Sequence, residues 1–365
     1  MKKLIKYILL PLPLFILFNC STATLEYTNG ITSIRTENNL VDGEKWLREA
    51  TEIDSVNALP PYQLGKLVFY KQEKWAEMND MFIIAENRNV DLELNDESFM
   101  VNDKVIGTVG EAIKLLRQDA VYKIIQSYIK DKNILTSIKE TIKREPIIEG
   151  IKEKLKLAIN ISPNSPEAYC ELSDIYKSEL DNVSALSTLN NGSNKNPNDW
   201  VIQYKLAEYY ESVDNLNKSL DACKKSVELG APSEVYSLMF RLYFDLGQID
   251  SAKEACEILI DRFQDNPQLL GSAFYNKGIL YRDIGANSFK IAQDNYFKKN
   301  AVNNKESILM DLEDALANLK IAKTNFEDYK YSTDSPDPNI DVLIKETRDY
   351  IYKIERKWIN RTKEL

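Results

Sequence analysis

One unit of about 34 residues occurs twice between Pro166 and Pro232, and this recurrence limits the fold more than any other feature of the sequence. Large, small and aromatic residues return at the same phase in both copies. The first copy holds them at Tyr169, Leu172, Ser173, Tyr176, Ala185, Leu189, Gly192 and Pro197, and the second at Gln203, Leu206, Ala207, Tyr210, Ser219, Cys223 and Ser226. A repeated unit of this length buries its apolar side by stacking on its neighbours. We therefore expect a repeat array through the middle of the chain.

The spacing resembles the tetratricopeptide repeat, a helix–turn–helix unit with a large residue, Leu followed by a small residue, Tyr, and then Ala, Phe and Pro. The resemblance implies an all-α solenoid of antiparallel helix pairs. Its repeats are expected near 132–165, 166–199, 200–232, 233–266 and 267–325, the last with an insertion or lengthened helices near 287–306. Small residues are expected where the two helices of a repeat cross. The pairs that meet this requirement are Ser173 with Ala185, and Ala207 with Ser219.

The segments outside this array are also predicted to be helical, with one exception. Residues 44–131 are expected to form an N-terminal helical region with a degenerate repeat, and Gly110 to Lys130 has clear helical spacing. The alternation from Ser98 to Ile106 predicts a small β-hairpin. Glu145-Pro146 is expected to be the turn of the 132–165 repeat. Residues 339–365 are expected to form a long helix that caps the array, with a docking or dimerisation helix as the alternative. Its apolar side is expected to hold Val342, Leu343, Tyr350, Ile351, Ile354 and Trp358.

The N-terminus predicts export. A basic start is followed by an apolar run from Ile8 to Phe18, which is too short to span a bilayer and reads as a secretory leader over 1–19. Its end, Leu17-Phe18-Asn19-Cys20, resembles a bacterial lipobox. That resemblance implies cleavage before Cys20 and acyl chains on this residue, and two or more such chains hold a protein stably on a membrane. An ordinary leader with an accidental cysteine is the alternative. The polar segment 20–43 is expected to be a flexible tether.

Charge and composition exclude several classes of function. The net charge is -9, and loss of the three leader lysines leaves 44 basic against 56 acidic residues. An acidic chain without a dense basic stripe is a poor nucleic-acid binder. The chain has no histidine, which excludes Ser-His-Asp and Cys-His catalysis and His-ligated metals. We predict that the protein is not an enzyme and has no catalytic residue, no cofactor and no metal site. Carboxylate or lysine chemistry stays open.

Three cysteines lie beyond the lipobox, namely Cys170, Cys223 and Cys256. No C-x-x-C pair suggests redox chemistry. Cys223 and Cys256 hold the same phase of successive repeats, too far apart for a disulfide. We expect both to be small buried hydrophobic residues.

The family resemblance also implies a binding surface, because first helices of such repeats line a concave groove. The residues at the matching positions that we take as candidates for partner binding are Glu167, Asp174, Lys177, Tyr204, Glu208, Glu211, Arg241, Phe244, Tyr275 and Arg282. Their first half is acidic and their second half is aromatic with arginines, residue types that often carry binding energy. We expect the groove to bind an extended or helical segment of another envelope protein, with basic residues toward the repeat at 166–199. A solvated surface with no ligand is the alternative.

Together these features predict a lipid-anchored repeat scaffold for protein–protein interaction in the bacterial cell envelope. The anchor would hold it on a bacterial membrane, with the outer membrane favoured and the face left open. Two other readings remain: an accessory lipoprotein that binds a small ligand or partners a transporter, and a surface-exposed adhesin.

Overall fold

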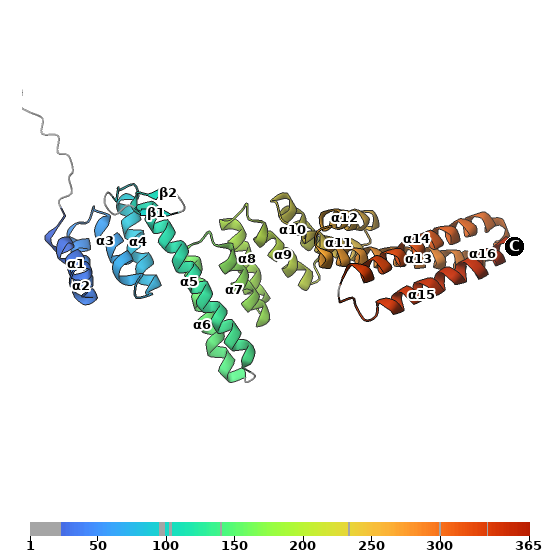
Figure 1. The fold of residues 1–365 in the computed structure, drawn as a ribbon, viewed down its shortest axis with the longest axis horizontal. Helices are drawn as coiled ribbons and strands as arrows, with labels where there is room; N and C mark the ends of the chain where they lie inside the picture. The colour runs from blue at the N-terminus through green and yellow to red at the C-terminus, as the bar shows by residue number, and fades with distance from the viewer. Residues whose placement is uncertain are drawn as a thin grey trace, which may run out of the picture. The chain divides into compact units, whose positions relative to one another are not determined.

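The computed structural model describes residues 23–365 apart from 95–98, 102–103, 139–140, 233, 299–300 and 334. The leader and Cys20 therefore lie outside the described residues. The chain divides into two compact units, Met1–Ala168 and Tyr169–Leu365, which are treated separately. Helices make up nearly all of the regular structure (Figure 1), so the all-α prediction is confirmed.

The first unit consists of short helices followed by a hairpin and a long helix pair. Its elements are α1 (Leu25–Arg35), α2 (Leu40–Ile53), α3 (Leu59–Leu64), the π-helical turn η1 (Gly65–Phe69), α4 (Trp75–Asn89), β1 (Phe99–Val101), β2 (Lys104–Ile106), α5 (Val109–Ser137) and α6 (Thr141–Ile161). The strands β1 and β2 pair antiparallel, with Phe99 opposite Ile106. The predicted hairpin is confirmed, and the helix predicted over 110–130 is confirmed and continues to Ser137.

The prediction of a flexible tether is wrong for residues 25–43, because α1 and the start of α2 lie there and pack on each other. Glycine permits this close contact. A Cβ added to Gly43 would lie only 2.2 Å from Cγ1 of Ile34, and Leu47 is fully buried beside Gly30. Helices that meet through glycines need few large apolar residues. For this reason the polar composition of residues 25–43 does not reveal that the segment forms packed helices.

The predicted turn at Glu145-Pro146 is also wrong, because α6 runs through Pro146. The break lies earlier, where α5 ends at Ser137 and Ile138 turns to an extended backbone. Pro146 lies in the second turn of α6, so its missing amide costs the helix one backbone hydrogen bond. Packing of α5 on α6 outweighs that loss here.

The second unit consists of successive antiparallel helix pairs. Its elements are α7 (Pro166–Ser178), α8 (Asn182–Lys195), α9 (Trp200–Ser212), α10 (Leu216–Glu228), α11 (Val235–Asp245), α12 (Ile249–Arg262), α13 (Pro267–Tyr296), η3 (Val302–Asn304), α14 (Lys305–Ser332), α15 (Ile340–Lys353), the π-helical turn η4 (Ile354–Trp358) and α16 (Ile359–Lys363). The turns inside the first three pairs each contain one residue with positive φ: Leu180 (64°), Asp214 (57°) and Gly247 (69°). The period seen in the side chains thus recurs in the backbone, where a left-handed residue ends each first helix.

Serine hydroxyls join the two helices of the first two pairs. Ser173 Oγ donates to the carbonyl of Ala185 at 3.1 Å, and Ser219 Oγ donates to the carbonyl of Ala207 at 2.7 Å. Both serines are buried, and the predicted crossing contacts are confirmed. In the third pair the large residue Phe240 is buried in one cluster with small residues of α12, namely Ala252, Ala255 and Cys256. In this pair only the second helix supplies small residues to the contact.

The last helix pair is longer than the others, and the lengthened-helix interpretation of 287–306 is confirmed. The helices α13 and α14 have 30 and 28 residues. Gly278 lets them approach, since an added Cβ would lie 2.5 Å from Cε1 of Phe326. On α14, the buried residues include Ala315, Leu319 and Ala322.

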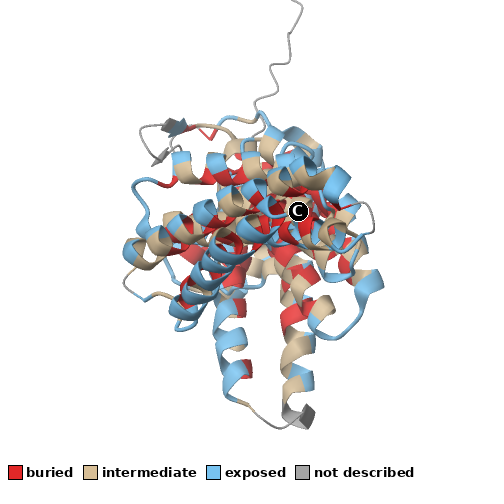
Figure 2. Ribbon diagram, turned by 90° about the vertical axis from the view of Figure 1, so that its right-hand side faces the viewer, coloured by how far each residue is buried: buried red, intermediate tan, exposed pale blue. Residues whose placement is uncertain are grey.

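The side through which the C-terminal helix packs shares Ile351, Ile354 and Trp358 with the predicted apolar side. Its buried residues (red in Figure 2) are Ile340, Ile344, Thr347, Ile351, Ile354 and Trp358. Val342 and Tyr350 are 53% and 40% exposed, so placing these two on the apolar side is wrong. Trp358 contacts the rings of Phe289 and Tyr296 edge-on, at centroid distances of 5.7 and 5.4 Å.

Candidate functional site

Ion pairs join neighbouring first helices of the second unit. Lys205 Nζ on α9 lies 3.1 Å from Asp174 Oδ2 on α7, and Arg241 Nη2 on α11 lies 2.8 Å from Glu211 Oε1 on α9. These contacts place α7, α9 and α11 side by side, and the pocket described below adds α13. We call the surface formed by these four helices the first-helix face. Candidates Asp174, Glu211 and Arg241 all lie on it.

Lys205 neutralises much of the acidic half predicted for this face. It pairs with Glu208 Oε2 at 3.0 Å as well as with Asp174. Burial alone would lower the pKa of Lys205, but hydrogen bonds and charge from Glu208 and Asp174 outweigh burial and raise that pKa above its usual value. A lysine so placed stays charged at every physiological pH. The spacing of Lys205 three residues before Glu208 is the sequence signal that would have found this group.

Aromatic side chains are the second component of the first-helix face. Tyr204 is half-buried against the core of the first two helix pairs, and burial raises the pKa of its hydroxyl. Phe244 is half-buried and stacks on Phe240, with ring centroids 6.0 Å apart. Both rings are held by the core, so they can present contact area with little loss of conformational freedom.

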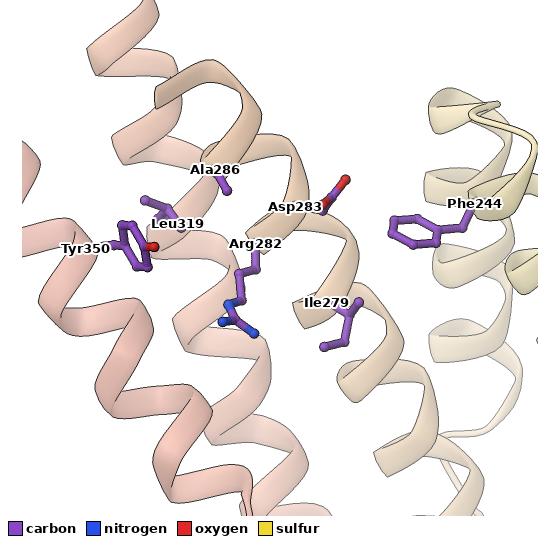
Figure 3. A pocket seen from close by; sticks show the side chains of 7 residues that line it. All are labelled: Phe244, Ile279, Arg282, Asp283, Ala286, Leu319 and Tyr350. Atoms are coloured by element: carbon purple, nitrogen blue, oxygen red, sulfur yellow. The ribbon is translucent and has the colours of Figure 1, made fainter. Parts of the chain in front are cut away.

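A pocket of about 400 Å³ lies where α11 faces α13 (Figure 3). Phe244 comes from α11, and Tyr350 comes from α15. The remaining lining residues are Ile279, Arg282, Asp283 and Ala286 of α13 and Leu319 of α14. Two of the predicted candidates, Phe244 and Arg282, thus meet at one cavity. A second cavity of about 520 Å³ adjoins it and is lined by Arg282, Glu346, Asp349, Tyr350 and Lys353.

The C-terminal helix changes the role of the last two candidates. Arg282 Nη2 pairs with Glu346 Oε2 on α15 at 2.8 Å. Tyr275 packs on the rings of Phe326 and Tyr329, with centroids 6.1 and 5.2 Å away, in a cluster that includes Ile340 and Ile344 of α15. The part of the first-helix face that belongs to α13 is therefore partly covered by the protein's own helix. The pattern of first helices does not select Tyr350 or Leu319 as site residues, because neither lies on a first helix.

The remaining candidates at the start of the array are not drawn into this arrangement. Glu167 is exposed and lines a cavity of about 360 Å³ in the first unit, beside Tyr122 of α5. Lys177 is half-buried on α7, and its side chain forms no ion pair with a described residue. Neither Glu167 nor Lys177 lines the pocket that contains Phe244 and Arg282.

The three described cysteines are buried and free, which confirms the prediction for Cys223 and Cys256. Burial raises the thiol pKa of each to about 12. Such thiols are protonated at neutral pH and react slowly. Across the described ranges no group of three or more Cys, Asp or Glu is placed to hold a metal ion, and no helix there is both long and apolar enough to cross a bilayer.

Among known proteins, only solved structures resemble this chain. No family model matches the chain, and no curated protein matches it. A crystal structure of MamA is 18% identical, with a TM-score of 0.36, over 53% of this chain and 99% of that one. A structure titled for pilF of Pseudomonas aeruginosa is 13% identical, with a TM-score of 0.41, over 65% and 90%. A tetratricopeptide repeat protein from Parabacteroides merdae is 12% identical, with a TM-score of 0.34, over 88% and 97%. Because the identities and TM-scores are this low, the fold assignment rests on the helix pairs described above.

Proposed function

We propose that this protein is a lipid-anchored scaffold of the bacterial cell envelope that binds a segment of another protein along its first-helix face. The observation that carries this proposal is the pocket at Phe244 and Arg282, which lies at the end of a surface ordered by cross-helix ion pairs. Held aromatic rings and arginines are typical of residues that supply binding energy. The absence of histidine argues against the commonest catalytic groups.

The ion pairs refine what the partner segment should look like. Lys205 forms ion pairs with Asp174 and Glu208, and Arg241 forms one with Glu211. These acidic groups therefore offer a partner less unpaired charge than the sequence suggests. A partner would gain most from apolar contact with Tyr204 and Phe244. Surface charge pairs would then contribute mainly to the rate and orientation of association.

Photo-crosslinking in cells tests the proposal. A photoreactive amino acid at position 204 or 244 should capture a defined envelope protein, whereas one at the exposed position Lys224 of α10 should not. Tyr204→Ala combined with Phe244→Ala should abolish that capture while leaving the far-UV CD spectrum unchanged. If the double variant captured the same proteins in the same amounts, the first-helix face would not be the binding surface.

The membrane anchor is proposed from the sequence of the leader. With a lipid on Cys20, the chain would run through only four residues before α1 begins at Leu25. An extended chain of that length reaches at most about 17 Å. The first unit would then stay close to the lipid surface.

The size of the pocket favours one second candidate. A cavity of about 400 Å³ falls within the range of small-molecule sites. An accessory protein that carries a small solute would use the same walls. Native mass spectrometry of protein purified from its own cells should then show an added mass that Phe244→Ala removes.

A further inference from the structure

A carboxylate without a counterion lies at the edge of the pocket between α11 and α13. Asp283 is exposed and lines the pocket, and its side chain forms no ion pair with any described residue. In Figure 3 it projects from α13 on the side that faces Phe244. The other charged residue of the lining, Arg282, is already paired with Glu346 at 2.8 Å. The unneutralised charge of the pocket is therefore negative.

The remaining walls suit a long side chain that ends in a cation. Phe244 and Tyr350 offer aromatic rings, and Ile279, Ala286 and Leu319 offer aliphatic surface. Lysine and arginine bury their methylene stems along such surface, and their charged heads gain from aromatic rings. A carboxylate binds guanidinium through two parallel hydrogen bonds and ammonium through one, which favours arginine.

The adjoining cavity adds no net charge to the pocket, so the negative polarity rests on Asp283. The adjoining cavity adds one further acid without an ion pair, Asp349, and one base, Lys353, whose ammonium lies 5.5 Å from the ring centroid of Phe289. Within the pocket lined by Asp283, the one base is Arg282, so a carboxylate ligand there would have to displace Glu346, whereas a cation could approach Asp283 without breaking any ion pair. Charge complementarity thus selects a positive ligand.

We infer that this pocket binds a cationic side chain, with arginine preferred over lysine, of the protein segment that lies along the first-helix face. The inference rests on the proposed function and specifies its partner: the segment carries an arginine or lysine at its end near α13, beyond the residues that contact Tyr204. It also gives α15 a role beyond capping, because Tyr350 forms one wall of the site.

Titration with small probes tests the pocket without knowledge of the partner. Ligand-observed NMR on the purified full-length protein would compare n-butylguanidinium with n-butyrate and n-butanol, which carry alkyl stems of three and four carbons and differ from it in head group. We expect n-butylguanidinium to bind most tightly, and Asp283→Asn and Phe244→Ala each to weaken its binding at least about fivefold. The matched control is Asp294→Asn, an exposed aspartate on the same helix that does not line the pocket; it should leave the affinity unchanged.

Three results would overturn the inference: tighter binding of n-butyrate, equal binding of n-butanol, or binding of n-butylguanidinium that is absent or insensitive to Asp283→Asn. A parallel capture experiment separates this failure from failure of the proposed function. If Tyr204→Ala with Phe244→Ala abolishes capture of an envelope protein but Asp283→Asn leaves capture intact, the charge preference is wrong and the scaffold function stands. If no protein is captured by the wild type although the guanidinium probe binds at Asp283, the scaffold function fails and only the preference of the pocket for a cation stands.

Discussion

At the scale of single residues, two glycines in helices show how local space decides the effect of one methyl group. Gly278→Ala should destabilise the second unit by about 1–3 kcal/mol, because the new Cβ would lie 2.5 Å from a ring carbon of Phe326. Gly150→Ala should stabilise the first unit by about 0.4–1 kcal/mol, because nothing lies within 4 Å and alanine favours the helix. Urea unfolding of each variant measures both. Equal shifts in the same direction would contradict this account of the α13–α14 contact.

The turn positions give a reciprocal pair of variants. Leu180 has a φ of 64° and is 85% exposed, so its side chain adds strain and little packing. Leu180→Gly should therefore stabilise the protein by up to about 1 kcal/mol, whereas Gly247→Leu at the corresponding turn should destabilise it by about as much. Thermal unfolding midpoints that moved in the opposite sense would show that side-chain contacts outweigh the backbone.

The buried thiols predict a dependence on pH. The pKa of Cys170, Cys223 and Cys256 is about 12 in the folded chain, against 9.0 as the ordinary value. Above the ordinary value the unfolded chain releases these protons while the folded chain keeps them, so the free energy of unfolding should fall between about pH 9 and 12. At pH 8 iodoacetamide should leave all three unlabelled until urea is added, as read residue by residue by mass spectrometry. Rapid labelling of the native protein would show that the thiols are accessible.

At the scale of elements, one buried tryptophan joins the C-terminal helix to the pair α13–α14 and its connection. Trp358 is 6% exposed and contacts Phe289, Tyr296 and Phe297 edge-on. Trp358→Ala should cost about 3–5 kcal/mol. The control Tyr352→Ala, at a 66% exposed position of the same helix, should stay within about 0.5 kcal/mol of the wild type in chemical denaturation.

The elements that the sequence predicts well are those whose contacts leave a periodic mark. The crossing of Ser173 on Ala185 and of Ser219 on Ala207 requires small residues at fixed spacing, so the helix pairs can be read from the pattern. The pairing of α1 with α2 produces no such pattern, because the two helices approach where Gly43 has no side chain. Pro146 misleads for the opposite reason: a strong local breaker is tolerated where tertiary packing holds the helix.

The candidate site was predictable in part. The pattern of first helices selects Phe244 and Arg282, but Tyr350 lies on a separate helix about a hundred residues from Phe244. Which side of α15 faces α13 depends on the docking of the whole C-terminal segment, and local sequence does not carry that information. The groove pattern selects Tyr204 and does not include its neighbour Lys205.

At the scale of the whole molecule, the proposed anchor makes membrane attachment depend on one sulfur atom. Cys20→Ser should move the protein from the membrane fraction to the soluble fraction and should abolish incorporation of an alkyne-labelled fatty acid in cells. Mass spectrometry of the N-terminal peptide should show the acyl chains on the wild type. Retention of Cys20→Ser in the membrane fraction would point to another mode of attachment.

Protease treatment of intact cells would then separate the scaffold from the adhesin at the same scale. A scaffold inside the envelope is protected until the outer membrane is opened, whereas a surface adhesin is cut at once. Lys224, which lies outside the first-helix face, and the other exposed lysines supply cleavage sites for trypsin in either case.

The wall that Tyr350 contributes to the pocket has a thermodynamic consequence. A ligand that touches this ring binds only those molecules in which α15 is docked, so occupancy and docking are linked and each favours the other. Filling the pocket should therefore slow hydrogen exchange at the backbone amides of α15. By the same reciprocity, loosening the C-terminal helix should release whatever the pocket holds.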